Sequence, residues 1–218
     1  MASSMLGKAE ERRIVVVAGV SLAVMAVVAG WSNFGSIQAV LVEGDAAQTR
    51  ENIEVSPTVF RLGILGFCLT VVLDLVVSWN LYRYFRPISE LGSAVAGGFR
   101  VGYTGVLVLA IANLAGALGS ASDSDALTSI TRFNTIWELG LGLFGLHLVF
   151  IGWLGLRGSN VPRWVSVLVV VAGIGYIIDS VGSAFFDDYS LGVTAYTFIG
   201  EVALMGWLLY RGFRLSRS

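Results

Sequence analysis

Four ionisable side chains lie near the centres of four long apolar segments: Asp74, His147, Asp179 and Glu201. A charged side chain at the centre of a bilayer costs about 3 kcal/mol on insertion scales, so such residues face the interior of a helix bundle, pair or stay neutral. They often mark proton relays and ion pathways in membrane proteins. Asn113 lies at a comparable depth in a further apolar segment. These five residues are the first candidates for a site that binds a proton, a cation or a small polar solute.

The residues around three of these candidates recur at helical spacing. Thr70 and Ser78 lie one helical repeat before and after Asp74, and small or hydroxyl-bearing residues flank Asp179 and Glu201 in the same way. Side chains three or four residues apart share one face of a helix. We therefore expect each polar face to point toward the bundle interior, where two or more of the ionisable groups would share a polar cavity.

Other interpretations of these residues stay open. A buried carboxyl group can be protonated and donate a hydrogen bond to a neighbouring helix, and a lone histidine is often a hydrogen-bonded core residue. One histidine with several carboxylates also suits Mg²⁺, Mn²⁺, Fe or Zn²⁺. The spacings H-x-x-E and H-x-x-x-H are absent, so metal ligands would have to come from different helices. The sequence leaves the cofactor unknown and a metal site as a hypothesis.

Glu138 occupies a different position from the central candidates. Its separation from His147 places the two side chains on opposite faces of one helix, at 3.6 residues per turn. We therefore expect Glu138 at the outer boundary of the membrane, paired with Arg132 or Arg61.

The composition predicts an all-α, polytopic membrane protein with one domain over residues 1–218. Hydrophobic residues make up 56% of the chain and charged residues 13%, whereas soluble domains carry about 25% charged residues. A helix needs about 20 apolar residues to cross about 30 Å of hydrocarbon. Six segments meet this requirement, and we predict transmembrane helices at residues 14–31, 60–82, 98–118, 136–156, 164–186 and 192–210.

The basic residues predict the orientation of these spans. With the N-terminus inside, all of the 14 Lys and Arg residues except Arg50, Arg61 and Arg132 fall in inner segments, and Arg100 is counted among the inner ones. An excess of Lys and Arg marks the cytoplasmic side. We therefore expect a multi-pass protein of the cell membrane with both termini in the cytoplasm. The net charge of -1 provides no field to attract nucleic acid, so the lipid bilayer is the expected partner.

Two further features concern packing and the loops. Gly98 and Gly102 form a small-xxx-small pair, which predicts close helix packing at that point. The outer loop at residues 32–57 contains a polar stretch from Glu43 to Glu54. That stretch predicts either a short amphipathic helix on the outer surface or an ordered cap over the bundle.

Several activities are excluded by residue counts. A single histidine excludes bis-histidine haem within one chain, and Lys8, the only lysine, lies outside the spans, which excludes a Schiff base within the membrane. Cys68 is the only cysteine, so no internal disulfide can form. No P-loop or dinucleotide fingerprint occurs.

Short sequence motifs carry a resemblance to a known family. The motifs are GDAAQTRENI at Gly44–Ile53, FRLGI at Phe60–Ile64, LFGLHL at Leu143–Leu148, GWL at Gly152–Leu154 and VPR at Val161–Arg163. With these motifs the chain resembles the bacterial membrane family labelled domain of unknown function 4386, from the first span to the fifth. The resemblance implies a six-helix integral membrane protein and brings no assigned activity.

The family motifs add three outer-loop candidates to the central residues. They contain Asp45, Asn52 and Arg61 as well as Thr49 and His147. Asp45, Thr49 and Asn52 are suited to cap a short helix, with Arg50 left in solvent. The functional alternative is a loop folded over the outer opening of the bundle and held there by Arg61.

The leading functional hypothesis is a transport-like or ligand-binding membrane protein whose polar interior uses Asp74, His147, Asp179 and Glu201. One alternative is a non-catalytic accessory protein in which these residues only pack helices. Another is a metal-dependent intramembrane enzyme, although an enzyme is the less favoured class. Six helices can enclose a small cavity, and a continuous pore would need a homo-oligomer. The sequence names no substrate.

Overall fold

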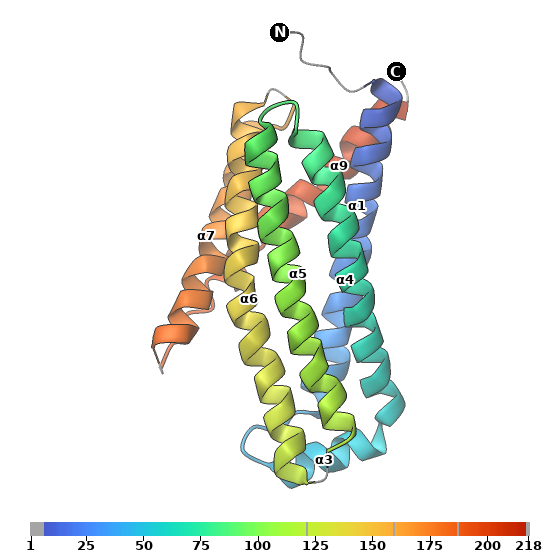
Figure 1. Ribbon diagram of the computed structural model, residues 1–218, viewed down its shortest axis with the longest axis vertical. Helices are drawn as coiled ribbons and strands as arrows, with labels where there is room; N and C mark the ends of the chain where they lie inside the picture. The colour runs from blue at the N-terminus through green and yellow to red at the C-terminus, as the bar shows by residue number, and fades with distance from the viewer. Residues whose placement is uncertain (1–6, 121, 159, 187, 217–218) are drawn as a thin grey trace.

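The computed structural model describes residues 7–216 apart from 121, 159 and 187, and across these residues the regular structure is entirely helical (Figure 1). The long helices are α1 (Lys8–Gly30), which continues as the π-helix η1 (Trp31–Ile37) and α2 (Gln38–Val40), then α4 (Pro57–Phe85), α5 (Glu90–Leu118), α6 (Asp123–Arg157) and α7 (Arg163–Phe185). The shorter helices are α3 (Ala46–Val55), α8 (Thr194–Thr197) and α9 (Ile199–Ser216).

Five helical segments are long and apolar enough to cross a membrane. They are Lys8–Val40, α4, α5, α6 and α7, and they correspond to the first five predicted spans. The sixth predicted span is divided between α8 and α9. Helix α9 has 18 residues and includes Glu201, Arg211 and Arg214, so its uninterrupted apolar part is shorter than the other five.

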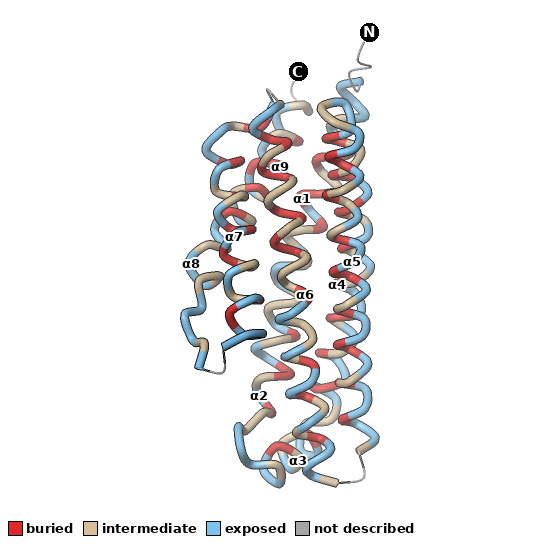
Figure 2. The backbone as a smooth tube through the Cα atoms, turned by 60° about the vertical axis from the view of Figure 1, so that its left-hand side comes forward, coloured by how far each residue is buried: buried red, intermediate tan, exposed pale blue. Residues whose placement is uncertain are grey.

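The helices pack as neighbours in an antiparallel bundle. Helix α5 lies between α4 and α6, α1 packs on α4, and α9 contacts both α1 and α7. The start of α1 and the end of α9 lie at one end of the bundle, and α3 crosses the opposite end (Figure 1). Buried residues recur along the sides of the helices that face their neighbours, and exposed ones cover the outside (Figure 2). The exposed side is rich in large apolar residues, including Phe185 and Tyr196, as a lipid-facing surface requires.

Two helices begin well before the apolar segments that predicted them. Helix α5 starts at Glu90 rather than 98, and α6 starts at Asp123 rather than 136. The hydroxyl oxygen of Ser89 accepts a hydrogen bond from the backbone N–H of Gly92, and the Ser122 hydroxyl oxygen accepts one from the N–H of Asp125. These N-caps satisfy backbone donors that would otherwise lack partners, so the helix start follows the cap rather than the hydropathy.

The first helix also extends beyond its predicted end at residue 31. It continues to Val40 through η1, in which the wider π-helical turn shifts the side chains around the axis. Ser36 in η1 donates a hydrogen bond from its hydroxyl to the Val59 carbonyl at 2.9 Å. The Ser32 and Ser36 hydroxyls lie so close to Gly66 and Gly63 of α4 that no Cβ could be accommodated there. The start of the predicted loop at 32–57 is therefore helical.

Close helix packing occurs at glycines other than the predicted pair. Gly98 is exposed with nothing within 4 Å of a Cβ position, and Gly102 has an ordinary neighbour, Leu143, at 3.7 Å. The prediction for this pair is wrong because no neighbouring backbone comes close to α5 at these two positions. The close crossing joins α6 and α7, where a Cβ on Gly145 would lie 2.6 Å from the Gly173 carbonyl oxygen and one on Gly173 would lie 2.5 Å from that of Gly145.

Candidate functional site

A buried ionic cluster joins α4, α5 and α6. Arg100 on α5 forms an ion pair with Asp74 on α4, with Nε and Nη2 at 2.8 and 2.6 Å from Oδ1. Its Nη1 lies 3.2 Å from Nε2 of His147 on α6. The other ring nitrogen of His147, Nδ1, lies 2.8 Å from the carbonyl oxygen of Ala96. Asp74, Arg100 and His147 are all at most 1% exposed.

The helices place these three side chains at one depth. At 1.5 Å per residue, each lies about 15 Å from the same end of the bundle, where α4 ends, α5 begins and α6 ends. That distance is half the thickness of a bilayer's hydrocarbon core. The three side chains therefore lie at one level of the bundle and are enclosed by protein.

The contacts of Arg100 fix the protonation state of His147. A guanidinium group has only donors, so Nε2 of His147 must accept the hydrogen bond from Nη1 and cannot carry a proton. Nδ1 then carries the proton and donates it to the Ala96 carbonyl. His147 is neutral in this arrangement, and the cluster contains one negative and one positive charge. The ring of Phe144, with its centroid 5.2 Å from Arg100 Cζ, covers the guanidinium group.

The structure thus brings Asp74 and His147 together through a residue that the sequence analysis placed elsewhere. Arg100 was counted among the basic residues of an inner loop, and that assignment is wrong because α5 starts ten residues before it. The available signal was its spacing: Ser93, Ala96, Arg100 and Thr104 follow one face of a helix, and all four are buried. Hydropathy averaged over a window of residues falls at an arginine, so a span predicted in this way stops there. The buried face that contains Arg100 is then not recognised.

Asp179 lies apart from the buried cluster, on α7. Its carboxylate accepts hydrogen bonds from the Tyr189 hydroxyl at 2.5 Å and from the backbone N–H groups of Val193 and Thr194 at 2.9 and 2.6 Å. These bonds hold the segment after α7 against the helix. The hydrogen bond to the Asp179 carboxylate raises the pKa of Tyr189 to about 12. Gly182 leaves the space that the Tyr189 ring occupies on α7.

A cavity of about 350 Å³ lies between α6, α7 and the segment that Asp179 holds. It is lined by Glu138, Leu141, Tyr176, Asp179, Ser180, Ser183, Tyr189, Ser190, Gly192 and Thr194. Glu138 was expected to pair with Arg132 or Arg61. Across the described part of the chain it has no ion pair and accepts no hydrogen bond, so that expectation is wrong. The reason is that α6 turns Glu138 toward α7, where no basic side chain lines the cavity.

The remaining central candidates lie at the edge of this cavity or outside it. The Tyr176 hydroxyl donates a hydrogen bond to Glu201 at 2.6 Å. Tyr176 lines the cavity, and Glu201 lies outside the lining. The Tyr176 ring meets Phe144 edge-on, with centroids 5.3 Å apart. Asn113 donates to the Leu109 carbonyl of its own helix at 3.0 Å and joins neither site. Of the five central candidates, only Asp179 lines this cavity, whereas Asp74 and His147 belong to the buried cluster with Arg100.

The family described as Domain of unknown function (DUF4386) matches residues 17–212. The chain belongs to this family. The match extends beyond the resembling motifs into α9. The chain is also similar to a protein of Archaeoglobus fulgidus named "Uncharacterized protein", with 31% identity over 164 residues that cover 75% of this chain and 91% of the archaeal one. No solved structure matches the chain.

Two DUF4386 motif residues stabilise the loop that contains α3. Asp45 is the N-cap of α3, and its side chain accepts a hydrogen bond from the Gln48 N–H at 2.9 Å. The side-chain amide of Asn52 donates to the Val40 carbonyl at 3.2 Å and so ties α3 to the end of the first helix. The predicted short helix in this loop is therefore present, and both residues have structural contacts.

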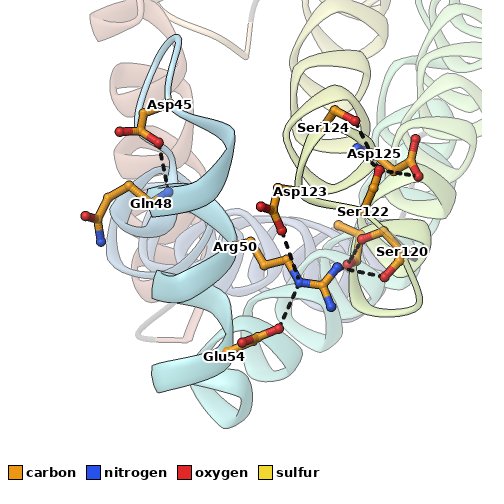
Figure 3. A network of polar contacts seen from close by, with 10 residues as sticks. Asp45, Gln48, Arg50, Glu54, Ser120, Ser122, Asp123, Ser124 and Asp125 are labelled. Atoms are coloured by element: carbon orange, nitrogen blue, oxygen red, sulfur yellow. Dashed lines mark hydrogen bonds and ion pairs between the residues drawn. The ribbon is translucent and has the colours of Figure 1, made fainter.

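Arg50, rather than Arg61, anchors α3 of this DUF4386 protein. Its guanidinium group donates to the Ser120 carbonyl at 2.8 Å and pairs with Glu54 at 2.8 Å and Asp123 at 3.6 Å (Figure 3). Arg61 is exposed and, within the described residues, makes no ion pair with the loop. The expectation that Arg50 is solvated and Arg61 holds the loop is wrong, because α3 directs Arg50 toward the connection between α5 and α6.

Among the described residues, no three His, Cys, Asp or Glu side chains lie close enough to hold a metal ion. Two distinct arrangements result instead. The first is a closed ion pair in the bundle core, and the second is an open cavity with an unpaired carboxylate.

Proposed function

We propose that this chain is a multi-pass protein of the cell membrane that binds a small cationic solute in the cavity between α6 and α7. The observation that carries the proposal is the Glu138 carboxylate, which has no partner among the described residues and lies in a cavity whose described lining contains no Lys, Arg or His. A volume of about 350 Å³ falls within the range of small-molecule sites, about 300–1,000 Å³. The second carboxylate, Asp179, adds negative potential to the same space.

The membrane topology in this proposal has six spans with both termini in the cytoplasm. Five helices support five spans, and α8 together with α9 would supply the sixth. Moving Arg100 from the inner loops to the bundle core leaves the bias of the other basic residues unchanged. The start of α1 and the end of α9 lie at one end of the bundle, as an even number of spans requires (Figure 1).

The two polar sites support different roles in this proposal. Asp74 and His147 bond to Arg100 and are enclosed, which favours the packing role that the sequence left open for them. Glu138 is exposed and unpaired within the described residues, and an unpaired carboxylate near a membrane surface attracts cations. We therefore assign solute binding to the cavity and not to the buried cluster.

Thermal unfolding of the detergent-purified protein tests the binding site. A ligand that binds only the folded state raises the melting temperature as its concentration rises. Small monovalent cations, organic and inorganic, would be titrated into wild type, Glu138→Gln and the control Glu51→Gln, which removes an exposed carboxylate on α3. We expect at least one cation to stabilise wild type and Glu51→Gln but not Glu138→Gln. Equal responses in all three proteins, or no response to any cation, would overturn the proposal.

Cysteine labelling tests the topology. In a Cys68→Ser background, single cysteines at Lys8 and Asp125 would be exposed to a membrane-impermeant maleimide on intact cells. We expect labelling at position 125 on intact cells and at position 8 only after lysis. The reverse pattern, or labelling of both positions from outside, would contradict the six-span arrangement with cytoplasmic termini.

A further inference from the structure

We infer that the cavity between α6 and α7 recognises a primary ammonium group, carried either by a free alkylamine or by the headgroup of an aminophospholipid. This inference rests on the proposed cation-binding function and adds the chemical class of the ligand. The observation behind it is the direction of the hydrogen bonds made by the hydroxyl groups in the cavity wall.

Four hydroxyl groups of the wall already donate their hydrogen to the protein. The Tyr176 hydroxyl donates to Glu201 and the Tyr189 hydroxyl donates to Asp179. The Ser180 hydroxyl donates to the Leu139 carbonyl at 3.2 Å, and the Ser183 hydroxyl donates to the carbonyl of Ser180 at 3.3 Å. A hydroxyl group has one hydrogen and two lone pairs. Each of these oxygens can therefore only accept a further hydrogen bond.

The carboxylates of the cavity wall also accept hydrogen bonds and do not donate them. Glu138 and Asp179, when ionised, are acceptors only, and Asp179 has already used part of its capacity on three protein donors. Among the residues that the structure describes, the lining has no Lys, Arg or His to supply donors. Ser190 and Thr194 add two hydroxyl groups that can also accept. The cavity wall is thus rich in acceptors around one unpaired negative charge.

Among monovalent cations, this wall favours a primary ammonium group. Such a group carries one positive charge and three N–H donors, as in lysine, so it can satisfy several acceptors at once. A quaternary ammonium group has the same charge and no N–H donor. Among the described residues, no three His, Cys, Asp or Glu side chains converge as a site for a multivalent metal ion would require. The side chains of Leu141 and Tyr176 offer apolar surface to the carbon atoms attached to the nitrogen.

The depth of the cavity suits an amine from the membrane surface as well as one from solution. Glu138 lies about 29 Å from the end of α6 at Arg157, at 1.5 Å per residue, which is close to the thickness of the hydrocarbon core. Phe185 and Phe186 at the end of α7 are 77% and 65% exposed. Their exposed rings offer apolar surface to lipid chains or to the carbon chain of an amine. A free amine from solution and an aminophospholipid headgroup could therefore both bring a primary ammonium group to the cavity.

Ethanolamine and choline form a matched pair of probes, because they differ only in methylation of the nitrogen. Their affinities would be measured by calorimetry on the detergent-purified protein, with Glu138→Gln and the control Glu51→Gln alongside. We expect ethanolamine to bind wild type about tenfold or more tightly than choline, which corresponds to one charge-assisted hydrogen bond. Glu138→Gln should remove this preference, whereas Glu51→Gln should keep it.

The outcomes separate this inference from the proposed function. If choline binds as tightly as ethanolamine and Glu138→Gln abolishes both, the cation site stands and the preference for a primary ammonium group is refuted. If neither probe and no other cation binds, both are refuted. Repeating the titration in nanodiscs distinguishes the sources: phosphatidylethanolamine should compete with added ethanolamine if the headgroup is the ligand, and phosphatidylcholine should not. Equal affinity in both lipids would assign the site to a free amine.

Discussion

Removal of the charge of Asp74 tests the buried cluster directly. Asp74→Asn keeps the shape of the side chain and the Oδ1 acceptor but leaves Arg100, 1% exposed, without a counter-charge. Arginine stays protonated at all accessible pH values, so the positive charge cannot be neutralised. The Asp74 Oδ2 atom has no hydrogen-bond partner among the described residues, and the amide group placed there would find no acceptor. Breaking a buried pair in this way costs about 3–5 kcal/mol.

The assay is thermal unfolding in detergent at one ionic strength. For a chain of this size each kcal/mol lowers the melting temperature by about 2–4 °C, so Asp74→Asn should lower it by at least about 6 °C. The control is Glu54→Gln in the pair with Arg50, whose side chains are 63% and 31% exposed. Exposed pairs contribute about 0–1 kcal/mol, so the control should shift the melting temperature by a few degrees at most.

A double variant distinguishes loss of charge balance from loss of packing. Asp74→Leu with Arg100→Met removes both charges and leaves apolar side chains, and such replacements are often neutral or stabilising. We expect the double variant to be more stable than Asp74→Asn. Part of the gain in the free energy of unfolding, about 1–3 kcal/mol, should be lost because Nε2 of His147 no longer has a hydrogen-bond donor. An Asp74→Asn variant as stable as Glu54→Gln would refute the reasoning that this ion pair balances a buried charge.

Three further predictions follow from single contacts. Gly173→Ala should destabilise the protein by about 1–3 kcal/mol, because its Cβ would lie 2.5 Å from a backbone carbonyl oxygen of α6. Gly98→Ala is the control, with open space around the new Cβ. In the same thermal unfolding assay it should be neutral or stabilising by up to about 1 kcal/mol. Asp45→Ala should cost about 1 kcal/mol through loss of the α3 N-cap, and amide hydrogen exchange should rise in α3 first. The pKa of the Tyr189 phenol should be about 12 rather than 10. Its hydrogen bond to the Asp179 carboxylate is therefore present below pH 10 and lost as the pH rises through 12. The phenolate absorbance that is present in wild type and absent from Tyr189→Phe, followed against pH, measures this titration.

The sequence predicted the parts of the fold that depend on solvation alone. Long apolar segments located five helices, because any helix in a bilayer must present apolar side chains over its length. The cost of burying a charge likewise predicted that Asp74 and His147 face inward, and both are fully buried. These are properties of single residues and single helices, so no knowledge of the packing was needed.

Properties that depend on pairs of helices could not be predicted in this way. Depth along a helix does not specify rotation about its axis, so Asp179 and Glu201 were grouped with residues that face another part of the bundle. Hydropathy treats an arginine as the end of a span, and Arg100 was therefore assigned to a loop although α5 carries it into the core. Gly98 has the small-xxx-small spacing with Gly102 and Gly145 has no small residue four positions away. Yet Gly145 packs closely and Gly98 does not, because the arrangement of α5, α6 and α7 decides which glycine meets another backbone.

The contrast between Asp74 and Glu138 shows why the partner of a carboxylate, and not its depth, indicates its role. Asp74 is fully buried and is neutralised by Arg100, so a further cation would have to displace a guanidinium group held by Asp74 and His147. Glu138 lies in the open cavity without a partner among the described residues, so a cation would gain its attraction at no such cost. Phe144 contacts both Arg100 and Tyr176 of the cavity wall. The Phe144 ring therefore connects the closed ion pair to the wall of the open cavity.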